Sequence, residues 1–348
     1  MTQPDRPIRR PTTTAPARRS QRVRQMACIG VLAWGLGPAA ALAADVAEPP
    51  VDGAPGRVDE ALTTTRASVR ASTEWVARHV DGWFGDKPFA DGGGVYDGQI
   101  SLNMLHRQDI GNDFNVGFNA RFRLPNVEDR SYVFIGRDNP DEVIADTPKE
   151  FSRRERLLSE TSEQRSVFAG LGIALRDAFD LRLGVRGGFK PYAQARYRKV
   201  IFLGDAQTER VEFRETFFWS VRDRLGATTA LSYEHPFTPT LAFRWLNAAT
   251  ITQASSGWSW SSSAGVLKSL GHRRTLSLEA LISGQRVDEG QVSEWGLQTK
   301  GQQPVHADWL LGHVILGHFW PRGHDTLAAR ERGNESSWAL GAGLTMLF

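Results

Sequence analysis

Apolar and polar residues alternate along most of the chain beyond residue 94. The clearest stretch runs from Asp113 to Leu124, where every even-numbered residue is apolar and every odd-numbered residue is polar or glycine. Successive side chains of a strand point to opposite faces, so this stretch predicts a strand with one apolar and one polar face. The pattern recurs less regularly in twelve further segments: Val95 to Arg107, Ser166 to Arg176, Asp180 to Phe189, Tyr192 to Leu203, Arg210 to Arg222, Ala227 to His235, Leu241 to Thr252, Trp258 to Lys268, Arg274 to Arg286, Val292 to Gly301, Trp309 to Trp320 and Trp338 to Phe348.

The last of these segments is apolar on one face, carries mainly Ala and Gly on the other, and ends on an aromatic residue. It resembles the terminal strand of bacterial outer-membrane barrels, whose last residues are recognised by the insertion machinery. The resemblance implies a β-barrel in the cell outer membrane, surrounded by outer-membrane lipid and inserted by the barrel assembly machinery. The predicted insertion signal consists of Trp338, Leu340, Leu344, Met346 and Phe348.

The beginning of the chain predicts export. Residues 1–25 are rich in Arg, and the apolar run from Met26 to Ala43 ends in Ala-Leu-Ala. This arrangement is typical of a secretory signal cleaved between Ala43 and Ala44. We therefore predict a signal peptide at 1–43, a periplasmic leader with an amphipathic helix at 44–93, and an outer-membrane barrel at 94–348.

The helix is predicted from Arg57 to Phe84, where apolar residues recur at helical spacing before Gly85. We expect it in the periplasm, packed over the barrel end. The alternatives are that it enters the barrel mouth, binds a partner or rests on the inner leaflet.

Single-chain bacterial barrels have an even number of strands, so thirteen segments must become fourteen or twelve. Fourteen follows if Ser131 to Gly136 is also a strand, and twelve follows if Asp180 to Leu203 is one bent strand. We favour fourteen, because Phe189-Lys-Pro-Tyr192 is typical of a chain reversal. The predicted fold is all-β, a transmembrane antiparallel β-barrel. The charged run from Asp138 to Arg165 is predicted to be a solvated extracellular loop.

Charge and composition exclude several classes of protein. Removing residues 1–43 takes away seven Arg and one Asp, which changes the formal net charge from +3 to −3. The basic charge that would favour a nucleic-acid partner is therefore confined to the predicted signal peptide. Cys28 is the only cysteine and lies in the predicted signal, so we expect neither disulfides nor a cysteine-ligated metal. Beyond the signal, no apolar stretch reaches the roughly 18 residues of a spanning helix, so a membrane location requires a closed barrel.

Several short motifs resemble those of a group of uncharacterised proteobacterial outer-membrane β-barrel proteins. The likeness covers residues 75–348 and implies a barrel without an assigned activity. One departure is that His313 and His318 stand where similar proteins carry acidic residues. The motifs are Trp83-Phe-Gly-Asp86, Arg121-Phe-Arg-Leu-Pro125, Tyr192-Ala-Gln-Ala-Arg-Tyr197, Glu215-Thr-Phe-Phe-Trp219, Leu225-Gly-Ala-Thr-Thr229, Asp308-Trp-Leu310 and Phe319-Trp-Pro321.

Candidate chemistry inside the barrel comes from charged residues on the predicted polar faces. They favour a narrow, non-enzymatic channel or small-solute binding barrel that prefers anions. The alternative is a salt-bridge network that merely fills a narrow barrel. A lipid-acting hydrolase or acyltransferase assembled from distant strands and an assembly or adhesion scaffold also remain open. The lumen candidates are Arg121, Arg123, Gln194, Arg196, Arg198, Arg214, Arg244, Glu234 and Glu279.

No catalytic residue, cofactor or metal is predicted. Ser232 and His235 are an odd number of positions apart, so they point to opposite faces of a strand and cannot form a local dyad. His313 and His318 are also an odd number of positions apart, so they point to opposite faces of a strand, which argues against a metal site formed by the two.

Overall fold

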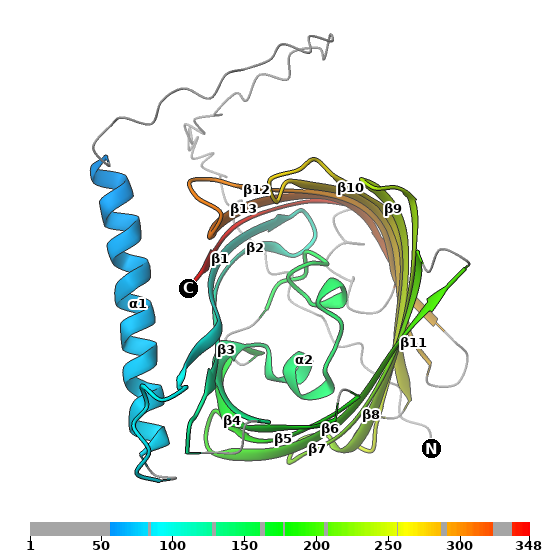
Figure 1. Ribbon diagram of the computed structural model, residues 1–348. Helices are drawn as coiled ribbons and strands as arrows, with labels where there is room; N and C mark the ends of the chain where they lie inside the picture. Colours follow the sequence, from blue (N-terminus) through cyan, green and yellow to red (C-terminus); the bar gives the residue numbers. More distant parts are fainter. Residues whose placement is uncertain are drawn as a thin grey trace, which may run out of the picture. The chain divides into compact units, whose positions relative to one another are not determined.

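The computed structural model describes residues 56–82, 85–126, 130–160, 164–176, 178–204, 208–255, 257–286, 291–322 and 336–348. Fourteen antiparallel strands form a closed barrel, in which each strand pairs with its sequence neighbours and β1 pairs with β14 (Figure 1). The strands are β1 Gly94–Arg107, β2 Gly111–Arg123, β3 Ser131–Asp138, β4 Ser166–Arg176, β5 Phe179–Arg186, β6 Lys190–Leu203, β7 Glu209–Ser220, β8 Arg224–Thr238, β9 Leu241–Thr252, β10 Trp258–Ser269, β11 Thr275–Arg286, β12 Gln291–Pro304, β13 Leu310–Pro321 and β14 Ser337–Leu347.

The strand count of fourteen is confirmed, and the alternative of twelve is wrong. The segment after Ser131 forms β3, which pairs with both β2 and β4. The predicted reversal separates β5 from β6, where Gly188 and Phe189 both adopt positive φ angles. One boundary differs from expectation, because Pro236 belongs to β8 rather than to the following turn. It lies at a register irregularity near the strand end, where a missing N–H is tolerated.

The outer face of the wall is mostly apolar, and the inner face combines polar and small residues with some buried large apolar ones. In β13 and β14, Val314, Leu316, Leu340 and Leu344 are exposed on the outer face, while Ile315 is buried on the inner face. Among the described residues, no helix is long and apolar enough to span a bilayer. We call the end of the barrel at which Phe348 lies the turn end; the opposite end, from which the long connection between β3 and β4 starts, is the loop end.

The connection between β3 and β4 folds into the barrel instead of extending into solvent (Figure 1). We call residues 139–165, described at 139–160 and 164–165, the inner segment. It contains α2 Pro140–Ala145 and the short helix η1 Lys149–Phe151. The side chain of Asn139 caps α2 by accepting a hydrogen bond from the Asp141 amide at 3.1 Å. Asp146, whose φ of 53° lies in the left-handed region, ends α2.

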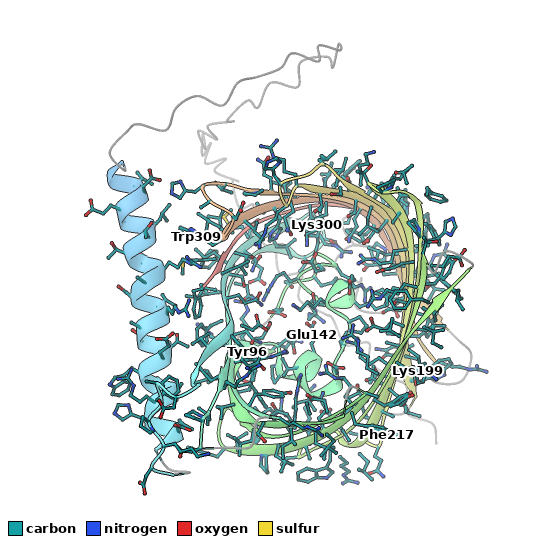
Figure 2. The ribbon with its side chains drawn as sticks, viewed as in Figure 1. Tyr96, Glu142, Lys199, Phe217, Lys300 and Trp309 are labelled. Atoms are coloured by element: carbon teal, nitrogen blue, oxygen red, sulfur yellow. The ribbon has the colours of Figure 1, made fainter. Side chains whose placement is uncertain are left out.

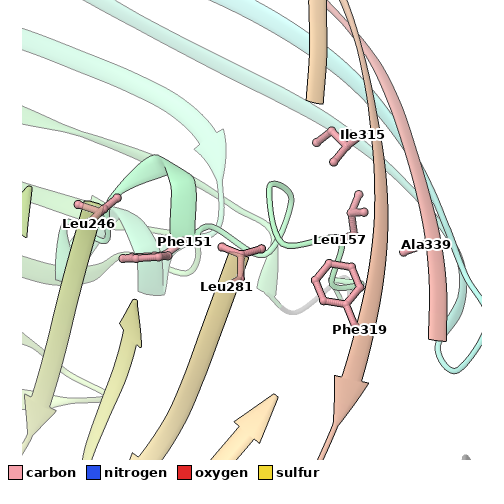
Figure 3. Close-up of a cluster of buried hydrophobic side chains, with 7 residues drawn as sticks. All are labelled: Phe151, Leu157, Leu246, Leu281, Ile315, Phe319 and Ala339. Carbon is pink, nitrogen blue, oxygen red and sulfur yellow. The ribbon is translucent and has the colours of Figure 1, made fainter. Parts of the chain in front are cut away.

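The prediction of a solvated loop at Asp138 to Arg165 is therefore wrong. Ile144 is 1% exposed and Leu157 is 2% exposed, because apolar side chains of the inner segment pack against the wall. Figure 3 shows Phe151 and Leu157 beside Leu246, Leu281, Ile315, Phe319 and Ala339 in one buried cluster. Several charged side chains of the segment, such as Asp146 and Glu155, form ion pairs with the wall, and these pairs replace contacts with solvent.

The long helix α1 Arg57–Asp81 lies outside the ring of strands (Figure 1). It packs beside the wall at the turn end and does not enter the mouth. Arg66 Nε donates a 2.8 Å hydrogen bond to the carbonyl of Leu347 at the end of β14. The predicted signal at 1–43, including Ala43 and Ala44, and the leader up to residue 55 lie outside the described residues.

Candidate functional site in the barrel lumen

In the described part of the chain, the inner segment contributes to two large cavities of the lumen that share no lining residue. The larger cavity, of about 1030 Å³, lies toward the loop end, and the smaller one, of about 330 Å³, lies toward the turn end. They follow one another along the inner face of β9, since Arg244 and Leu246 line the smaller cavity and Ala248 and Thr250 line the larger. Phe151 packs in the same buried cluster as Leu246 at the boundary.

Hydroxyl side chains form one side of the larger cavity. The opposite side belongs to the inner segment, which contributes Asp141, Glu142, Arg153 and Arg156. Figure 2 shows Glu142 inside the ring of strands. The cavity therefore combines neutral groups that both donate and accept hydrogen bonds with charges of both signs. The hydroxyl residues on its wall are Thr250, Thr252, Ser259, Ser261, Ser283 and Ser293.

The smaller cavity carries an excess of basic groups. Five basic side chains and three acidic ones line it. All four arginines pair with carboxylates: Arg198 with Glu212 at 2.7 Å, Arg210 with Glu234 at 3.2 Å, Arg214 with Asp146 at 3.4 Å and Arg244 with Glu150 at 2.9 Å. The basic residues are Lys149, Arg198, Arg210, Arg214 and Arg244, and the acidic ones are Glu150, Glu212 and Glu234.

The nine lumen candidates do not all lie together. Arg198, Arg214, Arg244 and Glu234 line the smaller cavity. Glu279 pairs with Arg244 at 2.7 Å.

Two further candidates contact the inner segment directly. Arg196 pairs with Asp146 at 3.2 Å, and Gln194 Nε2 donates to the carbonyl of Ile144 at 2.9 Å.

The remaining two candidates lie away from both cavities. Arg121 pairs with Asp97 at 3.8 Å, and the guanidinium of Arg123 lies 6.0 Å from the ring centre of Tyr96.

Sequence reasoning missed the partners that the inner segment supplies. Asp146 approaches Arg214 at 3.4 Å, and Glu155 pairs with Lys300 at 2.6 Å. The interspersed acidic and basic residues of 141–156 could have indicated ion pairs with the wall, but such charges are also typical of an exposed loop. Their partners lie on strands far away in the sequence.

Small residues on the inner face of β14 accommodate the inner segment. A Cβ atom at Gly341 would clash with Leu157, and one at Gly317 on β13 would clash with Phe319 and approach Leu157. The alternation of Ala and Gly in the last strand therefore leaves space for the side chain of Leu157. Nearby, Arg156 and Arg107 both pair with Glu294 of β12.

Two carboxyl groups of the inner segment have raised pKa values. Burial, helped by the nearby carboxylates of Glu160 and Asp138 and opposed by a hydrogen bond from the Arg153 amide, raises the pKa of Glu142 to about 7. Burial and Asp138 also raise the pKa of Glu160, against a hydrogen bond from Asn139. These groups make the packing of the segment sensitive to pH.

The residues considered for catalysis are separated by the wall. Ser232 lines the smaller cavity, whereas the ring of His235 lies 5.1 Å from that of Phe237, which is exposed on the outside. His313 contacts Gly343 on the inner face, whereas His318 lies between tryptophans. In the described part of the chain, no group of three or more His, Cys, Asp or Glu is arranged to hold a metal ion.

Comparisons with known proteins give only distant likenesses. No protein-family profile and no curated protein matches the sequence. The outer membrane channel DcaP of Acinetobacter baumannii is 9% identical, with a TM-score of 0.42 over 76% of this chain and 99% of its own. The anion-selective porin from Comamonas acidovorans is 9% identical, with a TM-score of 0.41 over 74% of this chain and 100% of its own.

A loop-deletion mutant of OmpT, an outer membrane protein of Vibrio cholerae, is 11% identical, with a TM-score of 0.40 over 74% of this chain and 100% of its own. Similarity at this level carries no argument about the function of the present chain. The resemblance to one particular group of uncharacterised barrel proteins stays a prediction.

Proposed function

We propose that this chain is an outer-membrane channel for small solutes, in which the inner segment sets the width of the pathway. The turn end then faces the periplasm and the loop end faces the outside. The apolar outer face, the polar inner face and the terminal aromatic residue support the membrane location. The observation that carries the channel is the pair of cavities that follow one another along β9, with Phe151 packed in the same cluster as Leu246 at their boundary.

A preference for small anions is part of this proposal. The five basic groups on the lining of the smaller cavity, against three carboxylates, support it. We expect the preference to be modest, because carboxylates pair with all four arginines and two of these carboxylates, Asp146 and Glu279, lie behind the lining. A purely structural salt-bridge network would show the same pairing of charges; the open volume of the smaller cavity beside these pairs is what supports a pathway.

Planar-bilayer recording of the purified protein tests this function. Under a salt gradient, the reversal potential should show anion preference, and Phe151→Ala should raise the single-channel conductance by opening the boundary between the cavities. Phe319→Ala is the matched control, because Phe319 belongs to the same apolar cluster but lines neither cavity. No conductance in any of the three proteins, or a cation preference, would contradict the proposal.

A further inference from the structure

The helix α1 runs across the turn end of the barrel, on the outside of the wall. Near its start, Asp59 pairs with His306 in the connection between β12 and β13. At its end, Asp81 accepts hydrogen bonds from the amide and side chain of Asn126, in the connection after β2, at 3.1 and 2.8 Å. The helix therefore passes outside four adjacent strands at the level of their terminal connections (Figure 1).

One stripe of α1 packs against the barrel. Ala77, which is 1% exposed, shares a buried cluster with Phe122 and Phe348, and Val69 and Val80 pack against the same cluster. With Thr73, which is 6% exposed, these positions recur at spacings of three and four residues, as expected for one face of a helix. The remaining surface of α1 forms two flanks, one on each side of this stripe.

The two flanks differ sharply in charge. Successive residues of an α-helix are rotated by about 100°. With this rotation, Glu60, Arg70, Glu74 and Arg78 all fall on one flank, where Arg70 and Glu74 form an ion pair at 2.9 Å. The other flank carries no charged Asp, Glu, Lys or Arg from residue 58 to residue 79, and it consists of Val58, Ala61, Thr65, Ser68, Ser72, Trp75, Val76 and His79.

The uncharged flank exposes its largest side chains. Trp75 is 59% exposed, Val58 is 69% exposed and Val76 is 37% exposed. At the same end of the barrel, Leu344 on the outer face of β14 is also exposed, so the uncharged flank continues the apolar outer surface of the wall. Apolar side chains exposed to water in this number mark an interaction surface.

We propose that α1 is an interfacial helix whose uncharged flank binds the phospholipids of the periplasmic leaflet, while its charged flank faces the periplasm. Helices of this kind lie in the membrane plane with the apolar side about 5–10 Å below the headgroups. Trp75 then occupies the headgroup level, where tryptophan is favoured. The charged flank keeps its ion pair in water and avoids the cost of burying charge in lipid. The helix thus extends the membrane contact of the barrel around the seam between β1 and β14.

This inference rests on the proposed membrane location of the barrel, and the experiment separates the two. Single cysteines are introduced into a Cys28→Ser background and labelled with an environment-sensitive fluorophore, and the full chain is reconstituted in phosphatidylethanolamine–phosphatidylglycerol vesicles. Ser72→Cys and Val76→Cys report on the uncharged flank, and Glu74→Cys is the matched control on the charged flank. Leu316→Cys, on the outer face of β13, reports whether the barrel itself lies in lipid.

The expected result is blue-shifted emission and quenching by brominated phospholipid at positions 72, 76 and 316, with iodide quenching at position 74. Lipid quenching at 316 but not at 72 and 76 would overturn the interfacial helix while leaving the barrel in the membrane. Protection of 72 and 76 from both quenchers would mean that protein covers the flank and would also overturn it. Lipid quenching absent at position 316 would refute the membrane location itself.

Discussion

Arg244 contacts two carboxylates that come from different parts of the fold. Glu150 belongs to the inner segment and lies 2.9 Å away, and Glu279 belongs to β11 and lies 2.7 Å away. In Glu150→Gln, Arg244 keeps only one charged partner, so the smaller cavity becomes more positive by one charge. We expect the reversal potential under a salt gradient to shift toward stronger anion preference.

Glu155→Gln is the control for this change, because Glu155 is also on the inner segment but pairs with Lys300 and lines neither cavity. It should leave the reversal potential nearly unchanged. A shift toward cations in Glu150→Gln would contradict the assigned role of Arg244.

Glu142 makes the inner segment respond to pH. Its folded pKa of about 7 lies above its ordinary value, so the packed state gains stability from the protonated form at low pH and loses it as the pH rises through about 7. We expect more frequent opening events in bilayer recordings at pH 8 than at pH 5.5. Glu142→Gln, which stays neutral, should reduce this difference and leave the part that Glu160 contributes; an unchanged pH dependence would contradict the role of Glu142.

At the scale of elements, the inner segment depends on the side chain of Leu157. This residue is 2% exposed and packs against Gly341 of β14 and the apolar cluster of Phe319 and Ile315. Leu157→Ala should destabilise the packed segment by about 2–5 kcal/mol, the usual cost of a cavity left by a buried leucine. The segment should then be cleaved faster by an added protease, while the strands stay protected. Equal cleavage rates for Leu157→Ala and the unmodified protein would show that Leu157 does not hold the segment.

The strands could be predicted from the sequence, whereas the inner segment could not. Alternation in stretches such as Asp113 to Leu124 identifies individual strands, and the even count assigns Ser131 to Gly136 to a further one. The partners of the inner segment, by contrast, are ion pairs between residues far apart, such as Glu155 with Lys300 and Arg156 with Glu294. Side-chain parity predicted that Arg198, Arg214, Arg244 and Glu234 face the lumen, but parity says nothing of the carboxylates that approach them from the segment.

For the whole molecule, the outer face should behave as a lipid-facing surface. Leu316 lies near the middle of β13, is exposed, and pairs in register with Leu340. Leu316→Lys should lower the free energy of unfolding in phospholipid vesicles by roughly 2–4 kcal/mol, the cost of a lysine near the bilayer midplane. Leu270→Lys, at an exposed leucine in the connection between β10 and β11, should change it little, and equal effects of the two changes would contradict the membrane orientation.

The hydrogen bond from Arg66 to the Leu347 carbonyl joins the first helix of the fold to its last strand. The docking surface of α1 includes Phe348 and residues of β1 and β2, so it is complete only after the last strand has joined the first. The helix precedes every strand in the chain, yet it can reach its final position only after the barrel has closed. Docking of α1 therefore reports that closure has occurred, and an undocked helix distinguishes an open, unfinished sheet from a finished barrel.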